Sequence, residues 1–347
     1  MQKLIGLIAL LAAAALPGAA LAQKSYDVCW SHYTGWEPWA YADEKGLLTK
    51  WAGKNGINVR LTLVNDYVES INLYTAGKYQ ACAMTNMDAL TIPAVGGIDS
   101  TALIVGSFSN GNDGIVIKKG ASVKDLKGRK IKLVQLSVSH YLLSRALALN
   151  GMRERDVTLV NTSDADIASL FLAESGGAAV TWNPMLLKAR SGKDVTLVFD
   201  SSKTPGEIID MMVVKSDAPD ALKKTLAGAW YETMAVMSGQ DKAARDAIAF
   251  MAQKAGGTLA EFEAQMKTTR MFYKAGEAAA FVRGPELKKT MEYVRSFSFE
   301  HGLYGPNAKS KDAVGIAFPD GGTLGNAKNV KLRFDAGVMQ AAADGKL

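Results

Sequence analysis

Residues 125–147 read DLKGRKIKLVQLSVSHYLLSRAL, and this stretch decides the fold that we expect. A turn at Gly128 precedes a short apolar run of strand length at residues 131–136, after which serines introduce apolar residues at helical spacing. A strand that passes directly into a helix leaves unpaired N–H groups at the carboxyl edge of a sheet, where open α/β sheets bind ligands. We therefore expect the hydroxyl of Ser137 to lie at a ligand site.

Three motifs of the chain resemble those of one protein family. The stretch LKGRKI, followed by SVSHYLL, resembles the start of the second lobe in periplasmic solute-binding proteins of the nitrate/sulfonate/taurine and thiamine-pyrimidine type. Residues 77–83 (GKYQACA) resemble the family's Gly-x-x-Asp-Ala/Ile-Ala segment, with Gln80 where Asp is usual, and residues 179–184 (AVTWNP) resemble its Trp-x-Pro segment. Near the start, residues 29–39 (CWSHYTGWEPW) look like the binding proteins encoded with urea carboxylase, which are regarded as urea or guanidine importers.

The resemblance implies an α/β, two-lobed periplasmic-binding-protein fold of type II, with two strand crossovers and a ligand cleft between the lobes. It implies lobe one at residues 23–110 and 213–347, and lobe two at residues 111–212. The expected crossings lie near residues 109–114 and 207–213. Apolar residues at three- and four-residue spacing predict helices at 218–237, 242–255, 259–267 and 286–301.

Residues 1–22 have the features of a secretion signal: Lys3, an apolar run at residues 4–16, and a small-x-small cleavage site that ends at Ala22. We therefore expect the mature protein in the periplasm, which is an oxidising compartment. The resemblance makes the strands that carry Cys29 and Cys82 neighbours in one sheet. A disulfide and two buried free thiols are both compatible with that placement.

The composition argues against several classes of function. Lys and Arg number 40 against 34 Asp and Glu, and the charges are interspersed, which is typical of a solvated surface rather than of nucleic-acid binding. Three histidines without a Cys-x-x-Cys motif do not suggest a metal site. The sequence lacks Gly-x-Ser-x-Gly, a phosphate loop, a dinucleotide fingerprint and the cysteine cluster of the pyrimidine-synthesising enzymes of this superfamily. We expect no enzyme activity, no catalytic residue and no cofactor.

The loops expected at the cleft combine aromatic rings with carboxylates. The expected ligand-binding residues are Trp36, Trp39, Asp66, Tyr67, Asp88, Ser137, Trp182 and Glu207. The wider set of aromatic and acidic loop residues also includes Tyr33, Glu37, Asp113, Asp200 and Asp210. Other roles stay open, because the tryptophans could pack in the core and Asp66, three residues before a glutamate, fits a helix cap. Aromatic faces together with carboxylates suit a small cation or a flat solute rich in N–H groups.

The resemblance implies the substrate-binding component of an ABC importer that serves nitrogen uptake. The preferred ligand is guanidinium or a related guanidino or amine compound. The alternative ligands are urea, a pyrimidine precursor, and an anion of the sulfonate or nitrate type. A less favoured alternative function is that of an enzyme of the pyrimidine-synthesis type. The expected partners are the small-molecule ligand and an inner-membrane permease with its ATPase. We expect a monomer that binds no nucleic acid.

Overall fold

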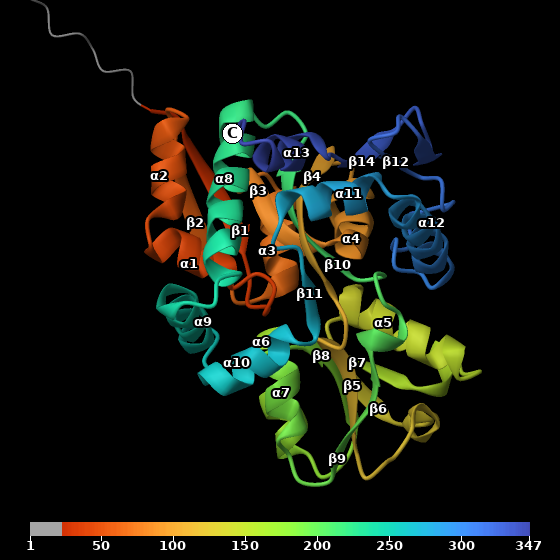
Figure 1. Ribbon diagram of the computed structural model, residues 1–347. Helices are drawn as coiled ribbons and strands as arrows, with labels where there is room; N and C mark the ends of the chain where they lie inside the picture. The colour runs from red at the N-terminus through yellow and green to blue at the C-terminus, as the bar shows by residue number, and fades with distance from the viewer. Residues whose placement is uncertain (1–22) are drawn as a thin grey trace, which may run out of the picture.

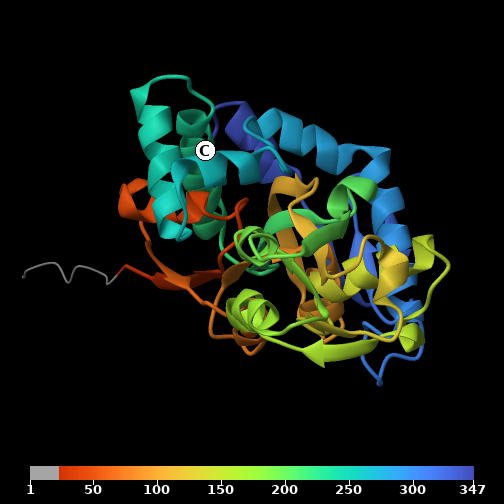
Figure 2. The same ribbon diagram turned by 90° about the horizontal axis from the view of Figure 1, so that it is seen from below.

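The computed structural model describes residues 23–347, so the predicted signal segment lies outside the described residues. The chain forms two α/β lobes, each built on its own sheet (Figure 1). Seen from below, the smaller lobe, in yellow and green, lies in front of the larger one (Figure 2).

The large lobe contains a nine-stranded sheet in the order β13-β12-β14-β4-β10-β3-β1-β2, with β11 paired to β4. Its strands are β1 (Ser25–Trp30), β2 (Asn58–Leu63), β3 (Ala81–Thr85), β4 (Ser100–Ser109), β10 (Ile209–Lys215), β11 (Thr269–Met271), β12 (Gly315–Ala317), β13 (Thr323–Gly325) and β14 (Val330–Phe334). Its helices are α1 (Pro38–Glu44), α2 (Leu47–Lys54), α3 (Tyr67–Thr75), α4 (Asn86–Ala89), α8 (Asp220–Met237), α9 (Lys242–Lys254), α10 (Leu259–Met266), α11 (Ala275–Arg283), α12 (Pro285–Glu300) and α13 (Gly337–Ala343).

The small lobe contains a five-stranded sheet in the order β7-β6-β8-β5-β9. Its strands are β5 (Asp113–Lys118), β6 (Lys130–Leu133), β7 (Thr158–Asn161), β8 (Ala178–Trp182) and β9 (Val195–Asp200). Its helices are α5 (Val138–Leu149), α6 (Asp164–Ala173) and α7 (Met185–Arg190).

The chain crosses between the two sheets twice within the described residues, as the fold class requires. It leaves the large sheet after β4 and enters the small one at β5, and it returns between β9 and β10. Strand β10 pairs antiparallel with both β3 and β4, so the returning chain lies in the interior of the large sheet. The second crossing therefore ends at Ile209, within the range expected from the sequence.

The stretch that decided the expected fold forms a strand, a turn and a helix. Strand β6 pairs in parallel with β7 and β8, and Ser137 caps α5 by accepting a hydrogen bond from the backbone N–H of Ser139 at 3.2 Å. Leu136 adopts a left-handed conformation, with φ of 61°, at the turn into the helix. The strand-to-helix step thus brings the start of α5 to the carboxyl edge of the small sheet.

The four helices expected after residue 218 are confirmed as α8, α9, α10 and α12. Near the start of the chain, the left-handed Gly46 (φ 68°) separates α1 from α2. The tail beyond residue 305 adds β12, β13 and β14 to the large sheet, followed by α13.

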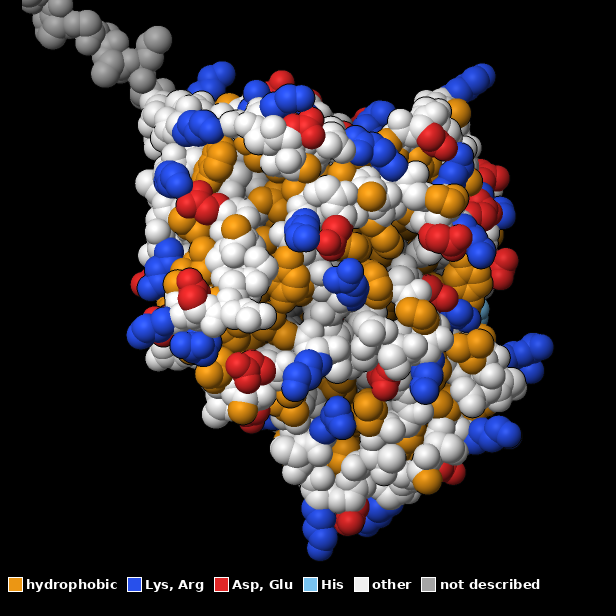
Figure 3. Space-filling model, viewed as in Figure 1, with side chains coloured by type: hydrophobic (Ala, Val, Ile, Leu, Met, Phe, Trp, Pro, Cys, Tyr) orange, Lys and Arg blue, Asp and Glu red, His pale blue; other side chains and the backbone are white. Residues whose placement is uncertain are grey.

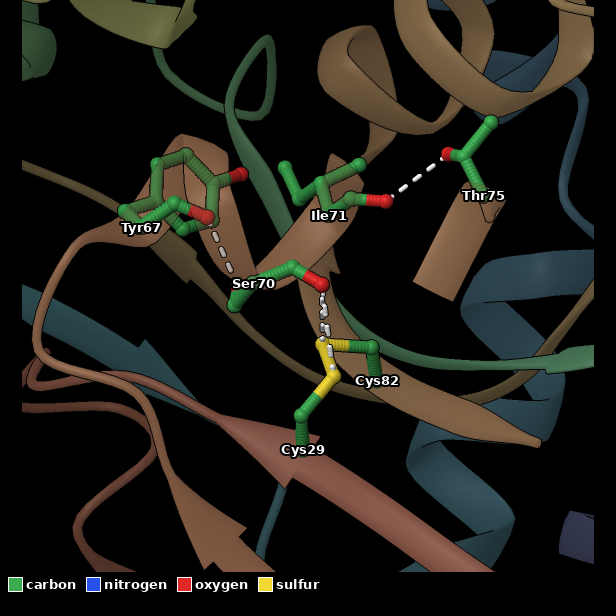
Figure 4. The surroundings of a disulfide bond; sticks show 6 residues. All are labelled: Cys29, Tyr67, Ser70, Ile71, Thr75 and Cys82. Atoms are coloured by element: carbon green, nitrogen blue, oxygen red, sulfur yellow. Dashed lines mark hydrogen bonds between the residues drawn. A yellow bond between two sulfur atoms is a disulfide. The ribbon is translucent and has the colours of Figure 1, made fainter. Parts of the chain in front are cut away.

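Cys29 and Cys82 form a disulfide between β1 and β3 (Figure 4). The two residues are register partners on neighbouring parallel strands, with their Cα atoms 4.4 Å apart. Both sulfur atoms lie against the carbonyl oxygen of Ser70 in α3, at 3.5 and 3.7 Å. The expected proximity of the cysteines is confirmed, and of the two open states the structure contains the disulfide.

Positive and negative side chains are interspersed over the face of the molecule that Figure 3 shows. Within residues 23–347, we find no helix with the length and apolar character needed to cross a membrane. The same residues contain no group of three or more His, Cys, Asp or Glu side chains placed to hold a metal ion.

Candidate functional site

A small enclosed cavity lies where the two lobes meet the crossing strands. Its free volume is only about 10 Å³, and it is lined by Tyr33, Trp36, Tyr67, Thr85, Asp113, Val138, Trp182 and Asp210. None of these residues is more than 4% exposed. Both lobes contribute to the lining, and none of the described lining residues is a lysine or an arginine.

Four aromatic side chains form a continuous wall of this cavity. The ring centroids of Tyr33 and Trp36 lie 5.0 Å apart, those of Trp36 and Tyr67 lie 5.5 Å apart, and those of Tyr67 and Trp182 lie 5.3 Å apart. The first three residues come from the large lobe, whereas Trp182 ends β8 in the small lobe. The wall therefore forms only when the lobes are together.

Two carboxylates line the cavity at the strands that join the lobes. Asp113 opens β5 directly after the first crossing, and Asp210 lies at the start of β10 after the second crossing. One oxygen of Asp210 accepts hydrogen bonds from the hydroxyls of Tyr33 at 3.0 Å and Ser107 at 2.6 Å. Among the described residues, the second oxygen of Asp210 and Oδ2 of Asp113 have no hydrogen-bond partner.

A third buried carboxylate, that of Asp88, lies directly behind the lining residues. Its Oδ2 accepts hydrogen bonds from the Tyr67 hydroxyl at 2.6 Å, the Thr85 hydroxyl at 2.9 Å and the backbone N–H of Val138 at 3.2 Å. Val138 begins α5, so the N-terminus of this helix points its N–H group at the carboxylate, an arrangement that stabilises negative charge. Within residues 23–347, Oδ1 of Asp88 has no partner.

Burial makes the charged form of all three acids unfavourable. It raises the pKa of Asp88 to about 6, that of Asp113 to about 7 and that of Asp210 to about 8. Hydrogen bonds from Tyr67 and Thr85 to Asp88, and from Ser109 to Asp113, oppose the increase. Repulsion by Asp88 further raises the pKa of Asp113, and repulsion by Asp113 further raises that of Asp210. At neutral pH these acids therefore carry a proton far more often than they would in water.

Hydrogen bonds between the lobes close the cavity. The indole N–H of Trp182 donates to the carbonyl oxygen of His32 at 3.1 Å, and the backbone N–H of Tyr67 donates to Asp164 at 3.1 Å. The bond from Val138 to Asp88 also joins the small lobe to the large one. The cavity is thus the interior of a closed cleft.

The structure brings four of the eight expected site residues together. Trp36, Tyr67 and Trp182 line the cavity, and Asp88 lies directly behind it. Ser137 caps the helix whose next residue, Val138, lines the cavity, but Ser137 itself does not line it.

The remaining three expected residues have other contacts. Trp39 packs against Trp230, with ring centroids 5.0 Å apart, beside a second small chamber. Asp66 caps α3 through the N–H of Glu69 at 2.9 Å and accepts a hydrogen bond from Ser163 in the small lobe.

Glu207 forms a bidentate ion pair with Arg145, with distances of 2.9 and 2.8 Å, and accepts a hydrogen bond from the Tyr141 hydroxyl. The pair lies outside the residues that line the cavity. Its position beside the second crossing suggests a contact between that crossing and α5 instead of a ligand contact.

Tyr33, Asp113 and Asp210 also line the cavity. In the sequence they belonged only to the wider set of aromatic and acidic loop residues and not to the eight expected ligand-binding residues. A stronger signal was present for Asp210, which is the single acid in the apolar strand IIDMMVV at residues 208–214. A charged residue in a strand that is buried on both faces is unfavourable unless it has a specific partner or ligand.

Comparison with known proteins finds similarity to binding proteins. The NMT1/THI5 like family model matches residues 38–205, just under half of the chain. A protein of Brucella abortus (strain 2308), described as a candidate binding protein, is 28% identical over 203 residues, which are 56% of this chain and 61% of the relative. The matched part thus spans less than two thirds of that relative's length.

Two solved structures share the fold. The alkanesulfonate-binding protein of Xanthomonas axonopodis pv. citri, bound to MOPS, has a TM-score of 0.67 at 15% identity and covers 83% of this chain and 97% of its own. The periplasmic nitrate-binding protein of Synechocystis PCC 6803 has a TM-score of 0.57 at 12% identity and covers 94% of this chain and 99% of its own. The expected periplasmic-binding-protein fold is therefore confirmed.

Proposed function

We propose that this chain is a solute-binding protein of the NMT1/THI5-like type, the substrate-binding component of an ABC importer, and that it captures a small planar cation. Guanidinium is the leading candidate. The observation that carries the proposal is the closed aromatic cavity in which Asp113 and Asp210 each present an oxygen that has no hydrogen-bond partner within residues 23–347.

A cation that enters a closed cleft loses its hydration, and this loss is large unless charged acceptors replace the water. Guanidinium carries N–H donors around its rim and presents a flat face on either side. Carboxylate oxygens from Asp113 and Asp210 would accept those donors, and Trp36 and Trp182 would cover the faces. The ligand in turn would supply the positive charge that the buried acids lack.

An anionic ligand fits these surroundings poorly. The solved relatives named above bind an alkanesulfonate or nitrate, yet the lining of this cavity contains two carboxylates and, among the described residues, no lysine or arginine. At a pH above the pKa values of Asp113 and Asp210, a buried sulfonate or nitrate would meet like charges directly, which is unfavourable. In this proposal, the chain shares the fold of these proteins but binds a different class of ligand.

Urea is a second candidate, and one observation favours it. Among residues 23–347, the buried indole N–H of Trp36 has no hydrogen-bond partner. Urea offers a carbonyl oxygen that could accept from this group, whereas guanidinium has no acceptor. The association with urea carboxylase that the resemblance implies stays a prediction and is compatible with either ligand.

A thermal-shift screen tests the proposal. The purified mature protein is heated with guanidinium, urea, methylamine, a pyrimidine, nitrate or ethanesulfonate at equal ionic strength. A ligand that binds the folded state stabilises it by about 2.7 kcal/mol when present at 100 times its Kd. We expect guanidinium to give the largest increase in Tm at the lowest concentration. A larger increase with nitrate or a sulfonate would contradict the proposal.

A further inference from the structure

The closed cavity is small for a ligand site. Its free volume of about 10 Å³ lies far below the range of about 300 to 1,000 Å³ that is usual for small-molecule pockets. The side chain of Trp182 forms the wall on the side of the small lobe and is 2% exposed. Its indole N–H is held by the His32 carbonyl of the large lobe.

Resting on the proposed function, we propose that Trp182, fixed across the cleft by the His32 carbonyl, restricts the site to unsubstituted planar cations and excludes N-alkylated guanidino compounds. Trp182 would then be a specificity-determining residue as well as a wall of the site.

Among the described residues, buried side chains surround the cavity on the sides through which a substituent would have to pass. The aromatic wall is continuous from Tyr33 to Trp182, and the remaining sides are formed by Asp113, Asp210 and the start of α5. A chain attached to the cation would have to pass between the lobes and displace the Trp182 to His32 bond or the Val138 to Asp88 bond. Each displacement would leave a buried polar group without a partner, which is unfavourable.

One neighbouring gap is too small to receive even a methyl group unless side chains move. It shares Trp36 and Asp210 with the cavity and is otherwise lined by apolar residues, among them Met211 and Trp230. The ring of Trp36 belongs to the lining of both spaces and packs against Tyr67. A substituent could enter this gap only if Trp36 moved. The test therefore compares guanidinium with compounds that carry substituents of increasing length.

The test measures calorimetric affinities of guanidinium, methylguanidinium, n-propylguanidinium and agmatine for three proteins: wild type, Trp182→Phe and Trp51→Phe. Trp182→Phe keeps an aromatic wall but removes the indole N–H and part of the side-chain volume. Trp51→Phe is the matched control, since its indole N–H donates to Glu232 at 2.8 Å and the residue does not line the cavity.

We expect the wild type to bind guanidinium at least about 100-fold more tightly than n-propylguanidinium or agmatine. Trp182→Phe should reduce this ratio at least about tenfold, whereas Trp51→Phe should leave it within about twofold. Wild-type affinities for n-propylguanidinium or agmatine within tenfold of guanidinium would overturn the inference, as would an unchanged ratio in Trp182→Phe. If Trp182→Phe does not fold, the wild-type series decides alone. Absence of guanidinium binding by the wild type would instead overturn the proposed function.

Discussion

Replacing Asp210 with asparagine tests the role of the buried acids, because the substitution removes a charge and preserves the shape of the side chain. One oxygen of Asp210 is held by Tyr33 and Ser107, and its other oxygen has no partner among the described residues. Two unit charges 4 Å apart interact with about 4 kcal/mol at an effective dielectric constant of 20. Removal of one partner from a buried charge pair typically costs 2 to 5 kcal/mol. Taking about 3 kcal/mol, we expect Asp210→Asn to weaken guanidinium binding about 100-fold.

The stability of the ligand-free protein should move in the opposite direction from the affinity. The pKa of Asp210 is raised from its ordinary value of 3.8 to about 8, so the stability contributed by its bound proton is complete below pH 3.8 and is lost as the pH rises through 8. At pH 8 the asparagine variant, which carries no charge to bury, should have an unchanged or higher Tm without ligand. A loss of affinity combined with an undiminished Tm cannot be explained by misfolding.

The assay is titration calorimetry with guanidinium chloride at constant ionic strength, alongside thermal denaturation without ligand. The control is Asp166→Asn, which removes an exposed carboxylate from the first turn of α6 in the small lobe. We expect the control to bind within about twofold of the wild type. Asp210→Asn binding within threefold of the wild type, or an equal loss in Asp166→Asn, would refute the role assigned to the buried charge.

Three further results are expected. Protonated Asp113 and Asp210 cannot neutralise a cation, so guanidinium affinity should fall as the pH is lowered from about 8 to about 5. Calorimetry at several pH values would measure this. An affinity that does not change with pH would show that these two acids do not change protonation state in this range. Replacing both Cys29 and Cys82 with alanine should lower the free energy of unfolding by about 4 kcal/mol, because the disulfide links residues 53 positions apart. Denaturant titration would measure the loss, and a loss below about 1 kcal/mol would contradict the expectation. Glu207→Gln should lower the free energy of unfolding by about 1 to 2 kcal/mol, because it weakens the ion pair with Arg145. It should weaken guanidinium binding less than Asp210→Asn does. A larger loss of affinity in Glu207→Gln than in Asp210→Asn would show that Glu207 contacts the ligand.

Much of the fold could be predicted because it is encoded locally. The strand-to-helix step around Ser137 and the helices after residue 218 follow from short-range spacing, and both appear in the structure. The pairing of β12, β13 and β14 with the large sheet was not predictable in the same way. These strands have three to five residues each, and β14 joins the sheet through β4, more than 200 residues earlier in the chain.

The candidate site shows a similar division. Trp36, Tyr67 and Trp182 could be proposed because they follow strand ends, where ligands are expected. The choice among the acids could not be made from the sequence, because Glu207 and Asp210 lie three residues apart near one crossing. Only the register of β10 shows that Asp210 lies beside Thr85 and Ser107, whereas Glu207 reaches Arg145.

Competition for the wild-type cavity is the most direct test of the cationic ligand. Guanidinium, urea, nitrate and ethanesulfonate are each titrated calorimetrically into the mature protein at pH 8 and equal ionic strength, and each is then titrated again with the protein saturated by guanidinium. We expect guanidinium to bind one-to-one and most tightly, and its presence to abolish any heat from urea. Tighter binding of nitrate or ethanesulfonate than of guanidinium would contradict the account, and tighter binding of urea would show that the buried acids serve a neutral ligand.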